Sequence, residues 1–326
     1  MPSSAVICCL SNRMRWQGPR ERTGRRTLSA AMRIGRDTMN NQTAENQALE
    51  TRAREFQFTD SDFNALRTLV KEMTGINLAE SKRELVYGRV SRRLRALGLS
   101  TFGEYRGLLE SGDGSELVAF CNALTTNLTS FFRESHHFDY LRDEFLAVRR
   151  NAGRRSERIR IWSSACSSGE EAYSIAMTII ETIPDWQKWD IKILATDLDS
   201  DILARAQRGR YTADRVKGFP PTRLARFFTE SREGAERTYQ VIPDLANLIT
   251  FKQINLMHDL PMPGPLDGIF CRNVVIYFDK ETQRALFARI AKLQRPGNLL
   301  FLGHSETLFK VSDEYALIGR TIYRRS

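Results

Sequence analysis

The stretch Arg158-Ile-Arg-Ile-Trp162, followed directly by Ser163-Ser-Ala-Cys-Ser-Ser-Gly-Glu-Glu171, decides the fold that this sequence predicts. Charged and apolar residues alternate up to Trp162, which is typical of a short strand. The small residues predict a loop, and the amphipathic run 172–183 predicts a helix behind it. An α/β sheet receives nucleotide-like ligands on such a loop between strand and helix. The loop ends on Glu170 and Glu171, however, and two carboxylates favour a cationic or hydroxyl-rich ligand over a phosphate.

The rest of the C-terminal half alternates between strand and helix patterns. Apolar runs predict strands at 191–195, 249–254, 266–271, 298–303 and 315–323, and helices at 203–207 and 279–293. This alternation predicts an α/β fold over residues 151–326, a doubly wound Rossmann-like sheet whose last strands are antiparallel. The pattern breaks at about 209–247, where 238–242 favours one strand of a small inserted antiparallel β-subdomain.

A different pattern precedes this domain. Helical spacing and capping residues predict helices at 60–74, 82–97, 101–110 and 115–126, and hence a small all-α N-terminal domain over 55–126. Residues 127–150 form a linker that carries the first site residues: 127–133 fits neither helix nor strand, and a helix follows from His136. Residues 1–54 lack periodicity and are rich in Arg, which predicts a disordered basic tail. The alternative is that this tail is translated from upstream of a natural start at Met32 or Met39.

The net charge of +10 is spread unevenly over the 326 residues. Residues 1–54 contribute +6 and the remainder only +4, so the pI of 9.6 gives weak support for nucleic-acid binding, which we do not expect. No apolar run approaches the ~18 residues of a membrane span, so we expect no membrane insertion. The five cysteines follow no disulfide-type or metal-type pattern, which favours a reducing cytoplasm.

Basic residues recur along the second predicted helix. Lys82, Arg89 and Arg93 follow helical spacing beside an apolar stripe, and Arg92 lies next to them. Two interpretations stay open: a solvated basic face, which is the usual case, or a docking ridge for an acidic helix or for phosphates.

Polar residues follow the predicted parallel strands, namely Glu170 and Glu171, Asp197 and Asp199, Asn255, and Arg272 with Asn273. Ligands bind at the carboxyl ends of such strands, so these side chains are expected to meet at one site, although each alone could simply cap a helix. Asp197 suits a ribose diol, because an ionised carboxylate accepts two hydroxyl hydrogen bonds, whereas Asp199 is expected to cap the next helix. Neither glycine motif for phosphates is present. A phosphate-free, positively charged nucleoside, S-adenosylmethionine, therefore fits best.

Five stretches together resemble one known family. They are Asn127-Leu-Thr-Ser-Phe-Phe-Arg133, Trp162 through Ser174, Ala195-Thr-Asp-Leu-Asp199, Ile269-Phe-Cys-Arg-Asn-Val-Val-Ile-Tyr-Phe278 and Gly303-His-Ser-Glu306. Over about residues 56–324 the sequence resembles the CheR family, the chemotaxis receptor glutamate methyltransferases. Cys166 and Ala172 depart from the alanine and proline that are usual there.

The resemblance implies an all-α domain, a linker, and a Rossmann-like S-adenosylmethionine-dependent methyltransferase domain with an inserted β-subdomain. It implies methyl transfer to glutamate side chains on cytoplasmic helices of chemoreceptors, with S-adenosylhomocysteine as product; we expect a cytoplasmic monomer that needs no metal. By motif position, the cofactor would contact Asn127, Thr129, Arg133, Glu171, Asp197, Asn255, Leu256, Arg272 and Asn273. Arg133 and Tyr277 would lie nearest the transferred methyl group.

This assignment suits the chemistry of the acceptor. A glutamate is already ionised at pH 7, so alignment and exclusion of water matter more than a strong base. Arg133 can hold a carboxylate with its fork of donors, and the Tyr277 hydroxyl can orient one oxygen, although an aromatic ring packed under the next helix is the alternative. Cys271 is interpreted as a small buried residue and His304 as a partner in a buried hydrogen bond.

Two neighbouring histidines, His136 and His137, are expected to point in different directions on their helix and not to share a metal. They are therefore interpreted as structural or surface residues.

The family also suggests partners for two surfaces. Receptor methylation sites lie on acidic helical bundles, which Lys82, Arg89, Arg92 and Arg93 would dock. Some members hold a receptor C-terminal peptide on the inserted subdomain by strand addition. Segment 227–240 has a single glycine here, where peptide-binding relatives have more, so this contact stays open.

Two other functions also stay open. One is a non-catalytic S-adenosylmethionine-binding module that docks a partner through the basic helix. The other is a nucleic-acid methyltransferase, which only the pI suggests.

Overall fold

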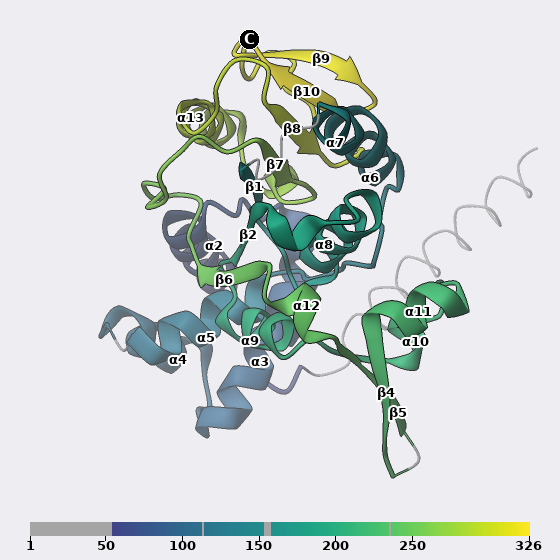
Figure 1. The fold of residues 1–326 in the computed structure, drawn as a ribbon. Coiled ribbons are helices and arrows are strands. Elements are labelled where there is room, and N and C mark those ends of the chain that lie inside the picture. Colours follow the sequence, from purple (N-terminus) through teal and green to yellow (C-terminus); the bar gives the residue numbers. More distant parts are fainter. Residues whose placement is uncertain (1–53, 113, 153–157, 235) are drawn as a thin grey trace, which may run out of the picture. The chain divides into compact units, whose positions relative to one another are not determined.

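The computed structural model describes residues 54–112, 114–152, 158–234 and 236–326, whose fold is shown in Figure 1. The predicted tail at 1–54 falls outside these residues except for its last position. Residues 56–326 make up one unit, in which a helical part is followed by an α/β part. Among the described residues, no helix is both long and apolar enough to cross a bilayer.

The α/β part is organised around one mixed sheet. Its strands are β1 (Arg158–Ser163), β2 (Asp190–Asp197), β6 (Ile249–Gln253), β7 (Gly268–Cys271), β8 (Leu299–Leu302), β9 (Tyr315–Gly319) and β10 (Ile322–Arg325). Within the described residues they form a seven-stranded sheet in the order β6-β2-β1-β7-β8-β10-β9. The first five strands in this order are parallel, and β10 is antiparallel to both β8 and β9. The predicted α/β sheet with an antiparallel end is thus confirmed.

One detail of the strand prediction is wrong. The run 315–323, predicted as one strand, is two strands separated by a turn in which Thr321 has φ 54°. A left-handed residue reverses the chain, so both halves of the apolar run pair with each other at the sheet edge.

Helices cover both faces of this sheet (Figure 1). They are α6 (His136–Tyr140), the π-helical segment η2 (Leu141–Leu146), α7 (Ala147–Asn151), α8 (Glu170–Thr182) and α13 (Lys280–Lys292). Alternating residues separate two cores: Ile161 and Phe270 pack with α6 and α8, whereas Trp162 and Ile269 pack with α13. This alternation of buried residues on both faces is what a doubly wound sheet requires.

The helical part contains the predicted helices of the N-terminal domain, at α2 (Asp60–Thr74), α3 (Arg83–Leu97), α4 (Phe102–Glu110) and α5 (Gly114–Leu124), with the 3₁₀ turn η1 (Glu80–Lys82) before α3. Thr59 and Thr101 start α2 and α4 with capping boxes, and Gly75 and Gly98 end α2 and α3 in the left-handed conformation. The core of these helices is continuous with the α13 face of the sheet. The helical part therefore packs on the α/β part and can contribute to a shared site.

The inserted subdomain is a three-stranded antiparallel sheet in the order β3-β5-β4. Figure 1 shows the β4–β5 hairpin projecting away from the main sheet. The elements around it are β3 (Arg210–Thr212), β4 (Phe228–Glu233), β5 (Glu236–Val241), α9 (Ser200–Arg208), α10 (Ala213–Val216), α11 (Pro221–Phe227) and α12 (Pro243–Ala246). Two 3₁₀ turns complete the α/β part, η3 (Trp186–Lys188) and η4 (Val275–Tyr277).

Candidate functional site

The order of the parallel strands marks the place of the site. Strands β2 and β6 lie on one side of β1, and β7 and β8 lie on the other, so the boundary between β1 and β7 is a topological switch point. A cavity of about 440 Å³, within the usual size of small-molecule sites, lies at the carboxyl ends of these strands. The predicted cofactor and catalytic residues all line it: Asn127, Thr129, Arg133, Glu171, Asp197, Asn255, Leu256, Arg272, Asn273 and Tyr277.

The helical part supplies the opposite wall of this cavity. Its lining includes Thr74, the segment 76–79, Lys82 and Leu85. Asn77 donates its main-chain N–H to the Tyr277 carbonyl at 2.8 Å, and the Asn255 side chain donates to the Met73 carbonyl at 2.6 Å. The sequence did not predict this wall, because no local pattern marks residues of the helical part that contact residues far along the chain in the α/β part.

The loop after β1 is held by main-chain bonds to its neighbouring strands. Ser164 donates to the Phe270 carbonyl at 2.9 Å and Cys166 to the Thr196 carbonyl at 2.8 Å. Gly169 has φ 96°, and a Cβ at this position would lie 3.0 Å from the Tyr211 hydroxyl. Only glycine fits this turn without strain, and α8 begins directly after it.

The two acids of this loop face different partners. Glu171 accepts from the Ser163 hydroxyl at 2.7 Å and from Arg272 at 2.9 Å on the cavity side. Glu170 instead pairs with Arg215 at 2.6 Å and accepts from the Ser168 hydroxyl at 2.6 Å. The alternative that such a residue caps a helix is wrong for Glu170, because its carboxylate pairs with a guanidinium of the inserted subdomain. Burial raises the pKa of Glu171, against the effects of Arg272 and Ser163.

The two acids after β2 also divide their roles. Asp199 accepts from the N–H groups of Asp201 and Ile202 at 3.0 Å, so the prediction that it caps α9 is confirmed. Asp197 is buried at the cavity wall and accepts from the Ser167 N–H at 2.8 Å. Burial raises the pKa of Asp197 to about 6, although N–H groups of Asp199 and Ser167 oppose this shift.

Several predicted cofactor residues also bind protein groups. The Asn127 amide donates to Asp199 at 2.7 Å, which connects the linker to the cap of α9. Asn255 uses both ends of its amide, one toward Met73 and the other toward the Met257 N–H at 3.0 Å. These two amides therefore shape the cavity wall. Asp197 lines the cavity as well, and its two carboxylate oxygens accept from the N–H groups of Ser167 and Asp199.

Arg272 is the buried centre of a charge network. Its guanidinium donates to Glu171 and to the main-chain carbonyl of Arg133, and it lies 3.5 Å from the Glu134 carboxylate. Its side chain is only 1% exposed, so its charge has to be paired inside the protein, and two carboxylates face it. Burial by itself would raise the pKa of Glu134, but the hydrogen bond from His304 and the charge of Arg272 outweigh it and lower the pKa to about 2.

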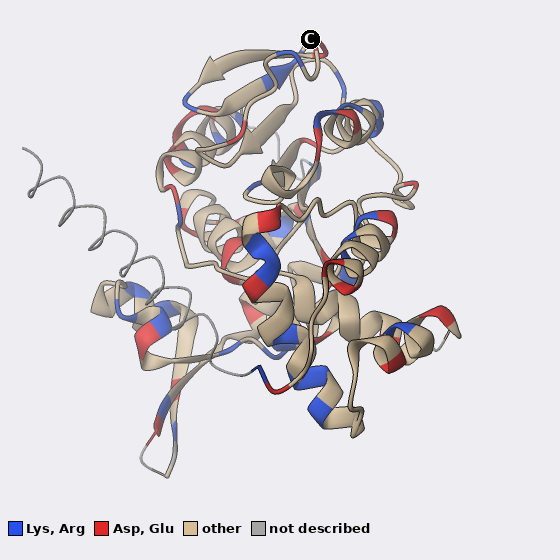
Figure 2. Cartoon of the chain, turned by 180° about the vertical axis from the view of Figure 1, so that it is seen from behind, with Lys and Arg blue, Asp and Glu red and all other residues tan. Residues whose placement is uncertain are grey.

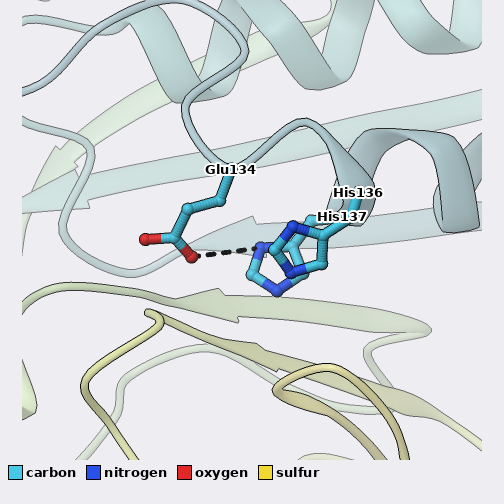
Figure 3. A group of neighbouring side chains, drawn as sticks. All are labelled: Glu134, His136 and His137. Atoms are coloured by element: carbon cyan, nitrogen blue, oxygen red, sulfur yellow. Dashed lines mark ion pairs between the residues drawn. The ribbon is translucent and has the colours of Figure 1, made fainter.

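A second cluster adjoins this network. The ligand atoms of Glu134, His136 and His137 lie within 4.8 Å of one another (Figure 3). The two imidazole centroids are 4.1 Å apart, so the expectation that the histidines point apart is wrong. Both rings turn to the same neighbouring loop, where His136 Nε2 lies 3.1 Å from the Arg320 carbonyl and His137 Nε2 lies 3.0 Å from the Thr321 hydroxyl.

The charge around this cluster disfavours a cation. The guanidinium of Arg272 lies 3.5 Å from Glu134 Oε2, the oxygen that faces His137. A metal ion at this place would face a fixed positive charge at close range. We interpret the cluster as structural.

Two further interpretations concern Cys271 and His304. Cys271 is fully buried, as predicted for a small core residue. His304 donates to the Glu134 carboxylate at 3.0 Å, but its side chain is 60% exposed, so the expected buried hydrogen bond is in fact at the surface.

The four basic residues expected to dock a receptor, Lys82 at the end of η1 and Arg89, Arg92 and Arg93 in α3, fall into two pairs. Figure 2 shows the Lys and Arg positions of the chain in blue. Arg89 donates to the Thr125 carbonyl at 2.7 Å, and Arg93 pairs with the buried Glu116. Lys82 and Arg92 are exposed, and Lys82 lies at the cavity. Arg89 and Arg93 therefore hold the helical part together, which leaves Lys82 and Arg92 as the residues most accessible to a partner.

Comparisons with known proteins agree with this architecture. The family model described as CheR methyltransferase, all-alpha domain, matches residues 61–125, and CheR methyltransferase, SAM binding domain, matches residues 127–324. The chemotaxis protein methyltransferase of Escherichia coli (strain K12) is 44% identical over 271 residues, which cover 82% of this chain and 92% of that protein. The chemotaxis protein methyltransferase 2 of Pseudomonas aeruginosa is 44% identical over 270 residues, which cover 82% and 94%. This chain therefore belongs to the CheR methyltransferase family and carries its S-adenosylmethionine-binding domain.

Proposed function

We propose that this methyltransferase forms methyl esters on glutamate side chains in the cytoplasmic helices of chemoreceptors, and that it works in the cytoplasm as a monomer. One observation carries the proposal: the residues expected to hold the cofactor and the residues expected to meet the acceptor line the same cavity. The relatives named as chemotaxis methyltransferases support the receptor as the substrate.

The donor set of the cavity fits S-adenosylmethionine. The acidic wall formed by Glu171 and Asp197 suits an ammonium group and a ribose diol, and Arg272 suits a carboxylate. The loop after β1 presents carboxylates where a phosphate-binding loop presents glycines. When bound, S-adenosylmethionine supplies a methyl group whose bond to sulfur breaks as a carboxylate oxygen takes it.

Arg133 and Tyr277 are the groups we assign to the acceptor. Both line the cavity, and Arg133 donates to the Leu128 carbonyl at 2.8 Å, which leaves further N–H groups of its fork for a carboxylate. Tyr277 lies in the turn η4, whose main chain contacts the helical part through Asn77. The two side chains would hold the acceptor oxygen in line for transfer while the helical part excludes water.

Lys82 and Arg92 are the residues we assign to receptor docking. Both are exposed, and Lys82 also lines the cavity. Exposed basic side chains raise the rate of encounter with an acidic helical bundle more than they raise affinity.

The proposal is tested by incubating the full chain with methyl-labelled S-adenosylmethionine and a purified receptor signalling domain. Labelled methyl esters that are released as methanol in mild base, and that disappear when the receptor glutamates are changed to alanine, are expected. Base-stable label would point to another acceptor. Calorimetric binding of S-adenosylhomocysteine without any transfer would favour a non-catalytic module, and salt-dependent transfer to RNA or DNA by residues 56–326 would favour a nucleic-acid substrate.

A further inference from the structure

The turn that carries Tyr277 is held by one distant carboxylate, that of Glu306. Its Oε2 accepts from the Asn273 N–H at 2.8 Å, and its Oε1 accepts from the N–H groups of Val274 and Val275 at 2.9 Å and of Ile276 at 3.3 Å. Successive N–H groups of an irregular backbone are therefore satisfied by a single side chain that is only 5% exposed.

The carbonyl groups of the same turn are satisfied by other side chains and segments. The Gln283 amide in α13 donates to the Val275 carbonyl at 2.8 Å and to the Phe278 carbonyl at 3.0 Å. The Asn77 N–H of the helical part donates to the Tyr277 carbonyl at 2.8 Å. The turn thus has few regular secondary-structure bonds of its own and takes its conformation from surrounding groups.

The close approach to Glu306 also depends on Gly303. Oε2 of Glu306 accepts from the Gly303 N–H at 2.6 Å. A Cβ at position 303 would lie 2.4 Å from the Asn273 amide nitrogen and 2.9 Å from its main-chain nitrogen. Asn273 itself has φ 58°, an uncommon conformation that its surroundings must hold in place.

The chemistry of this cradle requires a carboxylate. Both oxygens accept, and each of the five groups bonded to them is a main-chain N–H donor. A glutamine at 306 would turn one acceptor into a donor that faces N–H groups, which leaves buried donors unpaired.

We propose that Glu306 is a positioning residue for methyl transfer, which holds Asn273 and Tyr277 in the geometry that the reaction needs. This inference rests on the proposed function of the cavity. Glu306 does not line the cavity and acts only through the backbone of the turn. It assigns a role to Gly303-His-Ser-Glu306, a stretch that the reaction itself does not use.

The test compares Glu306→Gln with Asp267→Asn in the full chain. Asp267 is a matched control, because its carboxylate accepts from the Arg160 N–H at 2.7 Å and lies before the opposite end of β7, away from the cavity. At saturating receptor, Glu306→Gln should lower kcat on the order of 100-fold, with a much smaller change in the KM for the receptor. Asp267→Asn should leave kcat within about twofold.

Two further measurements separate positioning from general destabilisation. In a Tyr277→Phe background, Glu306→Gln should lower kcat by only a few-fold more, because the group that it positions is already gone. Hydrogen exchange of residues 273–276 should become faster in Glu306→Gln and stay unchanged in Asp267→Asn. A full multiplicative loss in the double variant, or unchanged exchange and kcat, overturns the proposal.

The role of Glu306 can still be tested if Glu306→Gln does not fold or if the wild-type chain shows no methyl transfer. If Glu306→Gln does not fold, Gly303→Ala takes its place. This variant adds one methyl group against Asn273 and retains the Glu306 carboxylate, and it should give the same loss of kcat and the same faster hydrogen exchange. Wild-type kcat and exchange in this variant would contradict the proposal. If the wild-type chain transfers no methyl group to the receptor, the proposed function fails, and the hydrogen-exchange comparison alone decides whether Glu306 positions the turn.

Discussion

The two walls of the cavity are built in different ways. The wall formed by the loop after β1 and by Asp197 follows directly from regular strands, and main-chain bonds to adjacent strands fix it. The wall formed by the turn at Tyr277 has an irregular backbone that Glu306, Gln283 and Asn77 hold from three separate parts of the chain. The first wall suits a cofactor of constant shape. In the proposed function, the second wall would position the acceptor through contacts that can change without altering the sheet.

Arg272 lies where these walls meet, and its loss should have the largest effect. Arg272→Ala leaves Glu171 and Glu134 without their buried partner, so the free energy of unfolding should fall by about 3–5 kcal/mol. Denaturant unfolding measures this value. Arg142→Ala is the control: it removes exposed ion pairs with Asp139 and Asp143, and it should lower the free energy of unfolding by only a small fraction of that amount. Equal losses in the two variants would mean that the network does not hold the walls together.

Asp197→Asn should weaken only the cofactor wall. It removes a charged acceptor from the proposed ribose site, so the affinity for S-adenosylhomocysteine should fall roughly 10–100-fold. Isothermal calorimetry gives this affinity directly. Leu198→Ala, at the next residue of the cavity wall, keeps the carboxylate and should change the affinity by less. An unchanged affinity in Asp197→Asn would remove Asp197 from the cofactor site.

The pH dependence of cofactor binding also tests the role of Asp197, with a smaller expected effect than the substitution. Burial raises the pKa of Asp197 to about 6, and only the ionised form accepts two hydroxyl hydrogen bonds. Affinity for S-adenosylhomocysteine should therefore be full above pH 7 and fall by at most about tenfold per pH unit below pH 6. Asp197→Asn should bind weakly with little dependence on pH across this range. The same slope in both proteins would assign the titration to another group.

Substitutions of the basic residues on α3 should have the smallest effects. Those at exposed positions should change the KM for the receptor, and those at paired positions should change stability. Arg92→Ala should raise the KM for the receptor a few-fold, more at low salt than at high salt, with no change in stability. Arg93→Ala should instead lower the melting temperature, because buried Glu116 loses a partner. Steady-state kinetics and thermal melts on both variants check this contrast. A stability loss for Arg92→Ala with no change in KM would reverse the assignment.

The sequence was sufficient to predict the parts of the site that obey local rules. The strand 158–162, the acidic loop, and the separation of Asp197 from Asp199 all follow from periodicity and capping over a few residues. The resemblance to a known family supplied Arg133 and Tyr277, which no spacing rule marks.

Contacts between distant segments could not be predicted in this way. Glu306 and Asn77 bind the turn at Tyr277 from the end of the chain and from the first helix pair, and their types alone are compatible with ordinary surface residues. For Arg89 and Arg93 the local pattern was misleading. Their spacing fits a docking ridge, but their side chains bind a carboxylate on α5 and a carbonyl just after it, within the helical part. Only the packing of the helical part on the sheet determines which basic side chains stay accessible.

In the proposed function, the turn at Tyr277 serves the transfer step, and the loop after β1 serves cofactor binding. Single-turnover methyl transfer by Tyr277→Phe, at saturating S-adenosylmethionine and receptor, tests this most directly, with Arg133→Ala measured in parallel. We predict a rate lower by about 10–100-fold for Tyr277→Phe, with its affinity for S-adenosylhomocysteine within about twofold of the wild type. A wild-type transfer rate in both variants, or a rate loss in Tyr277→Phe that its loss of cofactor affinity fully explains, would contradict the account.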